Sequence, residues 1–399
     1  MSLLDKFRPL AEAREALTGG GIDPFSFVVD RILSATEAIV NGRRTILVGT
    51  NNYLGLTVEP ACVEAARAAV QDFGTGTTGS RMANGSFSDH LALERELAQF
   101  YGRRSAVVFS TGYQANLGVI SAFTGPGDVL LIDSDSHASI YDGCKMSGAD
   151  IIRFRHNSAV DLDKRLRRLG ERTSNTLILV EGIYSMLGDR APLADIVDVK
   201  RKYGAYLLVD EAHSLGVVGA TGRGVTEEVG VEEHVDFIVG TFSKSLGSTG
   251  GFCTSDYPEL HLARYTSRPY MFTASPCPSV IASTRVALRI LQERPELRQR
   301  LWENAHRLYH RLHDLGFTLG ADLSPVIAAL LKSQEEAVAF WGALLERGVY
   351  VNLMLPPAAP NGMSLLRCSV SAAHTPEQMD EIGEAFASVK ESLLVQQGL

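Results

Sequence analysis

The stretch Gly240-Thr241-Phe242-Ser243-Lys244-Ser245-Leu246-Gly247 places a lysine among hydroxyl-bearing residues. It follows the apolar run 236–239, which predicts a buried strand that ends in a loop rich in glycine, serine and threonine. In open α/β sheets, ligands bind at the carboxyl ends of the strands. A partly desolvated lysine at such an end can form a Schiff base with an aldehyde cofactor. Taken alone, this octapeptide is explained better by an ordinary loop lysine.

A second apolar, β-prone run ends in Asp210-Glu211-Ala212-His213, which changes this interpretation. An enzyme that uses pyridoxal 5'-phosphate needs a Schiff-base lysine, a carboxylate at the pyridine nitrogen, donors for the phosphate and a group that orients the ring. Lys244 and Asp210 fit the first two roles. Thr241 and Ser243 fit the phosphate, and His213 can hold the phenolic oxygen. Each residue alone has an ordinary structural explanation, but together they predict a cofactor site.

The bulk properties describe a globular protein. With 399 residues, 45% hydrophobic and 21% charged residues, the chain is long enough for two domains. The net charge of −8 gives no reason to expect nucleic-acid binding. The five scattered cysteines form no CxxC or Cys/His metal spacing, so we expect reduced thiols, no metal and a cytoplasmic location. No secretory signal or spanning helix is predicted, and the amphipathic start leaves peripheral membrane contact open.

The chain begins with a predicted helix, residues 3–17, which Pro9 breaks or kinks near its start and which Gly19-Gly20-Gly21 ends. Residues 36–49 predict a hairpin, because Asn41-Gly42 is a tight-turn dipeptide between two strand-like runs. This arm can lie against a partner subunit. Asn52 follows in a polar loop that is a candidate for the substrate side, although a plain turn explains it equally well.

From about residue 105 the pattern alternates strand, loop and helix. Predicted strands occupy residues 105–110, 129–133, 177–181, 205–210, 236–240 and 251–253. Gly112 and Tyr113 open a helix after the first strand, and backbone amides at a helix start bind phosphate well. Nearly continuous apolar strands between helices predict an α/β fold with a mostly parallel sheet covered on both faces.

After about residue 275 the pattern shifts to that of a smaller α+β domain. It contains a long helical region, 278–314, interrupted by Pro295, then strands at 326–331, 349–353 and 365–370 and a last helix with a Thr375/Gln378 capping box. We therefore predict an N-terminal arm (1–50), a large cofactor-binding α/β domain (51–275) and a C-terminal α+β domain (276–399).

Four motifs together identify a family. They are Thr111–Asn116, Asp135–Ser139, Val209–Gly216 and Gly240–Lys244. The chain resembles the α-oxoamine synthases, fold-type I pyridoxal phosphate enzymes that join an amino acid to an acyl thioester with loss of CO2. The resemblance extends from about residue 20 to the C-terminus. It implies a homodimer with the active site at the subunit interface.

The resemblance implies roles for matching positions. Lys244 would carry the Schiff base and then move the Cα proton of the amino acid, and Asp210 would keep the pyridine nitrogen protonated. His137 would stack on the ring and help hold the substrate carboxylate. His213 would bind the phenolic oxygen. The implied phosphate contacts are Gly112, Tyr113, Thr241 and Ser243, with Thr273 from the partner subunit. Arg367 and Asn52 are implied on the substrate side, and Ser185 beside the cofactor.

Within the family, four stretches favour the branch that condenses L-serine with a long-chain acyl thioester to 3-oxosphinganine. They are His137–Cys144, Arg153–Ser158, Glu181–Asp189 and Arg268–Ser275. Two positions depart from that branch: Leu355 stands where it usually has arginine, and Asn51 where it tends to have tyrosine. These departures keep open a related synthase that uses glycine or alanine. A non-catalytic pyridoxal phosphate-binding protein is the remaining alternative. The acyl donor, coenzyme A or a carrier protein, stays open.

Overall fold

A computed structural model describes residues 2–18, 27–356 and 359–396. By their internal packing these residues form two compact units. The larger contains residues 51–185 and 189–301, and the smaller contains residues 1–50, 186–188 and 302–399. The division into three domains at residues 50 and 275 remains a prediction. In the structure, the helix that follows residue 275 packs within the larger unit.

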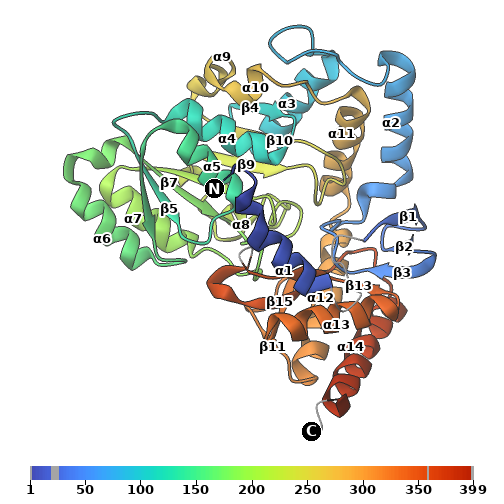
Figure 1. The fold of residues 1–399 in the computed structure, drawn as a ribbon. Coiled ribbons are helices and arrows are strands. Elements are labelled where there is room, and N and C mark those ends of the chain that lie inside the picture. The colour runs from blue at the N-terminus through green and yellow to red at the C-terminus, as the bar shows by residue number, and fades with distance from the viewer. Residues whose placement is uncertain (1, 19–26, 357–358, 397–399) are drawn as a thin grey trace. The chain divides into compact units, whose positions relative to one another are not determined.

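The larger unit is built on a seven-stranded sheet (Figure 1). In spatial order its strands are β4 (Ser105–Phe109), β10 (Gly251–Ser255), β9 (Phe237–Thr241), β8 (Tyr206–Asp210), β7 (Thr176–Glu181), β5 (Val129–Asp133) and β6 (Asp150–Phe154). All neighbours are parallel except β10, which runs antiparallel to both β4 and β9. The predicted α/β fold with a mostly parallel sheet is confirmed.

Most strands of this sheet are completely buried. Every residue of β4, β5, β7, β9 and β10 is buried, as expected when both faces of a sheet are covered. The helices of this unit are α2 (Pro60–Phe73), α3 (Ser88–Phe100), α4 (Gly112–Phe123), α5 (Ala138–Ser147), α6 (Ala159–Leu169), α7 (Leu193–Tyr203), α8 (Val225–Glu228), α9 (Ala263–Thr266), α10 (Arg268–Met271) and α11 (Pro278–Glu293). Five of the predicted strands agree closely with the structure, and so does the predicted extended run at 251–253.

Strand β6 was not predicted from the sequence. It is one of the two edge strands of the sheet, and its residues are mostly exposed, including Asp150 and Arg153. The exposed positions give β6 no continuous apolar run, whereas the other edge strand, β4, is fully buried and has one. Backbone pairing with β5 defines this strand, and the local sequence pattern does not predict that pairing.

The smaller unit contains two four-stranded sheets. The first has the order β1 (Val29–Ile32), β2 (Glu37–Val40), β3 (Arg43–Leu47), β13 (Val349–Tyr350). The predicted hairpin is confirmed, with Asn41 at φ 50° and Gly42 at φ 74°, as a type I′ turn requires. The second sheet has the order β11 (Thr318–Leu319), β12 (Val326–Leu331), β15 (Ser364–Ser369), β14 (Asn352–Met354).

The single strand predicted at 349–353 is two strands in different sheets. β13 pairs with β3 of the first sheet, whereas β14 pairs with β15 of the second. The helices of this unit are α1 (Arg8–Thr18), α13 (Gln334–Glu346), α14 (Pro376–Gln396) and the part of α12 (Glu296–Asp314) from Trp302 onwards. The predicted Thr375/Gln378 capping box is present, with reciprocal backbone-to-side-chain hydrogen bonds of 3.1 and 3.2 Å.

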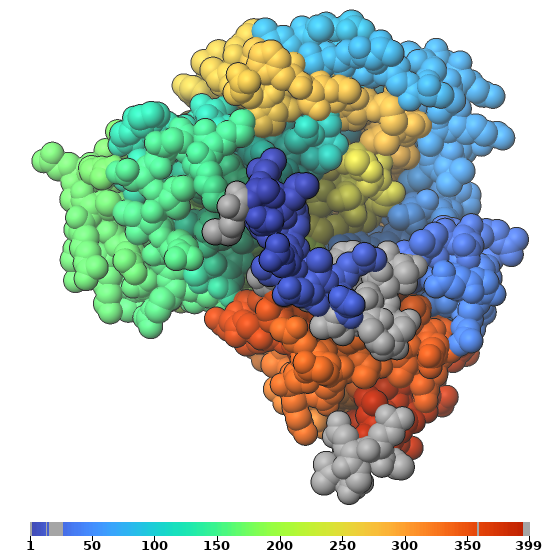
Figure 2. All heavy atoms as spheres, in the orientation of Figure 1, coloured from blue at the N-terminus to red at the C-terminus, as the bar shows by residue number. Residues whose placement is uncertain are grey.

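The N-terminal segment, drawn as dark blue spheres in Figure 2, carries exposed apolar side chains. Leu3, Leu4 and Leu10 are more than 60% exposed, and Phe7 is 51% exposed. The predicted stop at Gly19-Gly20-Gly21 lies outside the described residues. Across the described residues, every helix is too short or too polar to traverse a lipid bilayer.

Candidate active site

A cavity of about 250 Å³ lies at the carboxyl ends of β8 and β9. Parallel neighbours bring their carboxyl ends to one edge of the sheet, so residues far apart in the sequence meet there. The cavity is lined by Thr111, Gly112, Tyr113, Asn116, His137, Ser139, Glu181, Asp210, Ala212, His213, Val239, Gly240, Thr241, Ser243 and Lys244. Eight of the predicted site residues are therefore in one place, including Lys244 with Asp210.

Asp210 is the last residue of β8 and is held by two donors. One carboxylate oxygen accepts the backbone N–H of Ala212 at 2.9 Å, and the other accepts the side-chain amide of Asn116 at 2.7 Å. The same Asn116 amide group also donates to the hydroxyl of Ser139 at 2.9 Å. These bonds fix the direction of the Asp210 carboxylate, and Asn116 ties α4 to β8.

Glu181 is the in-register neighbour of Asp210 on β7. Complete burial, and secondarily the negative charge of Asp210, raise the pKa of Glu181 well above its usual range. Glu181 accepts the backbone N–H of His137 at 2.5 Å. The carboxyl group of Glu181 therefore positions the start of α5 rather than adding a second negative charge to the cavity.

His137 is the N-cap residue of α5. Its Nδ1 atom lies 2.7 Å from the hydroxyl of Ser139 and accepts the backbone N–H of Ser139 at 3.2 Å. Burial lowers the pKa of His137, and the positive charge of Lys244 lowers it further. A neutral imidazole is thus favoured at neutral pH, which suits a ring that stacks on an aromatic cofactor.

His213 is held by Tyr53, a residue that was not predicted to belong to the site. The phenolic oxygen of Tyr53 lies 2.7 Å from Nδ1 of His213, and Tyr53 is completely buried. The two residues are 160 positions apart. Their contact depends on the tertiary fold, and only the adjacency of Tyr53 to the polar pair Asn51-Asn52 hinted at a role.

The other end of the cavity is suited to a phosphate. Gly112 begins α4, so its N–H lies at the positive end of a helix. A side chain at Gly112 would lie 2.8 Å from Thr241, so only glycine allows this close approach. The hydroxyls of Thr241 and Ser243 lie 2.8 Å apart. Tyr113 also lines the cavity, with its hydroxyl donating to Asp142 on α5.

Four predicted residues do not line this cavity. Asn52 donates to the hydroxyl of Thr57 at 2.8 Å, and the hydroxyl of Thr273 accepts from Gln114 at 3.1 Å. Ser185 follows β7, in the turn after Glu181. Arg367 belongs to the smaller unit, where it is 5% exposed within β15. Their roles in substrate or cofactor binding remain predictions.

Comparison with known proteins identifies the family. Residues 43–386 match the model of the class I and II aminotransferases. A relative from Caulobacter vibrioides named serine palmitoyltransferase is 58% identical over 98% of this chain and 97% of its own. The chain belongs to the α-oxoamine synthases. A Sphingomonas wittichii serine palmitoyltransferase structure is 52% identical, with a TM-score of 0.96 over 99% of this chain and 100% of that one.

These synthases are pyridoxal phosphate-dependent acyltransferases. A serine palmitoyltransferase structure that contains pyridoxal phosphate is 49% identical to this chain, with a TM-score of 0.96 over 99% of it and 100% of the other chain. The cavity fits this cofactor, because an amine, a carboxylate and a helix N-terminus line it together. The glycine at position 112 leaves room where a Cβ atom would collide.

A substitution of Asn116 tests how Asp210 is positioned. In Asn116→Ala, the Asp210 carboxylate loses one of its two donors, and a hydrogen bond to a charged group is worth about 1.5 to 3 kcal/mol. We expect kcat/KM to fall roughly 10- to 100-fold and the cofactor to bind more weakly. Ser121→Ala on the same helix is the control, since its hydroxyl bonds only the helix carbonyl of Leu117. Unchanged kinetics and cofactor affinity in Asn116→Ala would contradict this role.

A second polar cluster lies beyond the carboxyl ends of β5 and β6. His156 bonds Asp133 through Nδ1 at 2.8 Å and Asp189 through Nε2 at 2.7 Å. Burial opposes the charged ring, but the bonds to both carboxylates outweigh it and raise the pKa of His156 to about 10. Asp133, Asp135 and His156 have ligand-type atoms within 4.8 Å of one another. An imidazolium that uses both nitrogens as donors is not a metal ligand, so we interpret the cluster as structural.

The raised pKa of His156 predicts a pH dependence of stability. The stabilisation is complete below the unfolded-state pKa of about 6.5 and is lost as the pH rises towards about 10. Between these pH values, we expect the free energy of unfolding of the wild-type protein to fall by on the order of 2 to 3 kcal/mol more than that of His156→Gln, as measured by urea denaturation. His310→Gln, on the exposed face of α12, is the control. If the free energy of unfolding changed with pH equally in the wild type and in His156→Gln, a charged His156 paired with both carboxylates would be excluded.

Proposed function

We propose that this chain is a serine palmitoyltransferase. It joins the Cα atom of L-serine to the acyl carbon of palmitoyl-CoA or a similar long-chain thioester. The serine carboxylate leaves as CO2 and the thiol is released, which gives 3-oxosphinganine. The observation that carries the reaction class is the meeting of Lys244 and Asp210 in one cavity. The choice of serine is supported by relatives of that name at 58% and 50% identity over nearly the whole chain.

Lys244 and Asp210 have different roles in the proposed reaction. Pyridoxal phosphate, when bound, supplies an electron sink for the charge that develops at Cα. Lys244 takes the proton from the serine Cα and later returns one to the product. Asp210, held by Asn116 and Ala212, presents a fixed negative charge to the pyridine nitrogen. Neither oxygen of Asp210 has to reorient during the reaction, which lowers the cost of stabilising charge.

The remaining side chains bind and orient. The amides at the start of α4 and the hydroxyls of Thr241 and Ser243 would hold the phosphate. His213, fixed by Tyr53, would bind the phenolic oxygen. His137 would stack on the ring in its neutral form and donate from Nε2 towards the serine carboxylate. Ser185 would contact the cofactor, and Asn52 and Arg367 would bind the substrate.

The active form in this proposal is a cytoplasmic homodimer in which Thr273 of one subunit completes the phosphate site of the other. Support comes from the family resemblance and from the exposure of neighbouring apolar side chains. Leu262, Tyr265 and Phe272 are 60%, 66% and 71% exposed. Exposed large apolar side chains close to Thr273 in the sequence support a subunit contact there.

A titration of the purified holoprotein separates the amino-acid substrates. We expect a saturable change in cofactor absorption with L-serine, and 3-oxosphinganine by mass spectrometry after palmitoyl-CoA is added. The identical titration with glycine and L-alanine is the control, because Leu355 and Asn51 depart from the serine-using pattern. A stronger response and product formation with glycine or alanine would move the chain to another branch of the family. Absence of cofactor absorption would overturn the whole proposal.

A further inference from the structure

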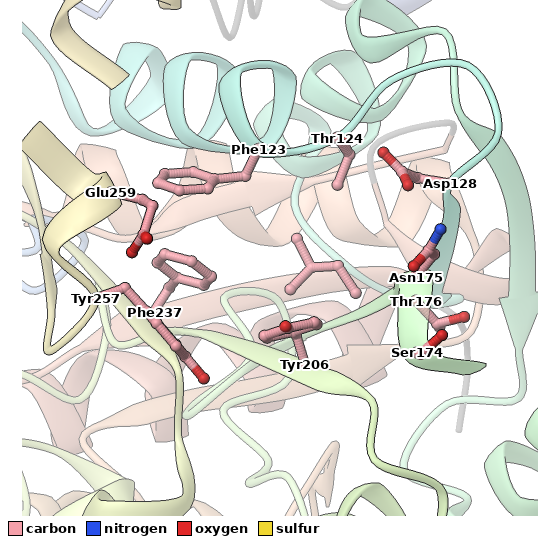
Figure 3. Close-up of a pocket in the computed structure, with 11 residues that line it drawn as sticks. Phe123, Thr124, Asp128, Ser174, Asn175, Thr176, Tyr206, Phe237, Tyr257 and Glu259 are labelled. Carbon is pink, nitrogen blue, oxygen red and sulfur yellow. The ribbon is translucent and has the colours of Figure 1, made fainter. Parts of the chain in front are cut away.

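The larger unit has a second cavity, of about 440 Å³, at the other ends of the strands from the active site. Leu177, Tyr206 and Phe237 line it from the amino ends of β7, β8 and β9, whereas the active site lies at the carboxyl ends. The other lining residues come from the end of α4 and the following loop, from the turn before β7 and from the segment after β10 (Figure 3). Nothing in the proposed reaction uses this cavity.

Four aromatic rings form a continuous wall of this cavity. The ring centroids of Phe123 and Phe237 are 4.6 Å apart, and those of Phe237 and Tyr257 are 5.8 Å apart. Tyr206 meets Tyr257 edge to face at 6.0 Å. Tyr206 and Tyr257 are 40% and 38% exposed, so the wall is open to a ligand from solvent. The faces of aromatic rings carry partial negative charge and attract cations.

The charged residues that line the cavity have one sign. Among the described lining residues only Asp128 and Glu259 are charged, and they lie on opposite sides of the rings (Figure 3). Helix α4 also ends here, at Phe123 with its cap Thr124, so the negative end of its dipole faces the same space. The ammonium group of Lys200 is paired with Asp236 at 2.9 Å, and Asp236 also accepts the hydroxyl of Tyr257.

We propose that this cavity binds an organic ammonium cation. Its alkyl groups pack on the four rings, and its charge lies between Asp128 and Glu259. An anion would meet two carboxylates and a helix C-terminus without a compensating cation. A neutral apolar ligand would desolvate the same carboxylates without pairing them. An alkylated ammonium ion can both pack on the aromatic rings and pair with the carboxylates. The cavity volume is in the range of small-molecule sites.

Calorimetric titration of the holoprotein with choline, against its neutral carbon isostere 3,3-dimethyl-1-butanol, tests the proposal. The two probes have nearly the same shape and differ in charge. We expect saturable binding of choline and at least roughly fivefold weaker binding of the neutral isostere. Equal affinity for both probes, or no saturable binding of choline, would overturn the proposal.

Variants locate the site. Tyr206→Ala should weaken choline binding roughly fivefold or more, whereas Tyr206→Phe, which keeps the ring, should retain it. Glu259→Gln should weaken binding a few-fold in low salt, and Glu64→Gln, an exposed acid on α2, is the matched control. Turnover should be unchanged in all four, which also shows that they fold. Undiminished choline binding by Tyr206→Ala would place any bound cation elsewhere and contradict the assignment.

Discussion

Replacement of Lys244 by alanine is expected to reduce turnover by at least about 10³-fold. Among the described residues that line the active-site cavity, Lys244 is the only amine, and no other side chain of this set can take the Cα proton from the same position. His137 does not replace it, because burial lowers the pKa of His137 and its Nδ1 is bonded to Ser139. The remaining contacts to the cofactor are untouched by the substitution.

The measurement is product formation from L-serine and palmitoyl-CoA, together with retention of the cofactor. After borohydride reduction and denaturation, the wild-type protein should keep the cofactor and Lys244→Ala should release it. Lys202→Ala is the matched control, since Lys202 is exposed and paired with Asp163 at 2.7 Å. Near-normal turnover by Lys244→Ala would refute the assigned mechanism.

Replacement of Glu94 by glutamine is expected to destabilise the protein by about 3 to 5 kcal/mol. Glu94 is 5% exposed and bonds Arg81 at 3.0 Å and Arg264 at 2.9 Å. Burial opposes the carboxylate, but the two guanidinium groups outweigh this and hold the pKa of Glu94 below its usual value. Glutamine would leave two largely buried positive charges without a counter-charge.

Glu96→Gln is the matched control for this prediction. Glu96 lies on the same helix and also pairs with an arginine, Arg285, at 2.6 Å, but both side chains are about one third exposed. A pair that is partly exposed to solvent contributes about 1 kcal/mol or less. In urea denaturation, Glu94→Gln should therefore lose clearly more unfolding free energy than Glu96→Gln. Similar losses in both would show that the buried network contributes no more than a surface pair.

The sequence alone was sufficient for the fold class and for most of the active site. Near-continuous apolar strands alternating with helices are a local signal, and so are Asp210 at the end of one such strand and Lys244 in the loop after another. Because parallel strands end at one edge, these local signals place both residues together. The hairpin at Asn41-Gly42 and the Thr375/Gln378 cap were also predictable, because a few adjacent residues determine their geometry.

The tertiary structure decided what depends on partners that are distant in the sequence. Strand β6 and the separation of β13 from β14 are defined by pairing with other strands. Asn116 holds Asp210 from 94 residues away, and Tyr53 holds His213 from 160 residues away. Periodicity reports which face of an element is buried, but a hydrogen bond between side chains requires both elements to be docked. The direction of each catalytic group is therefore a property of the folded protein.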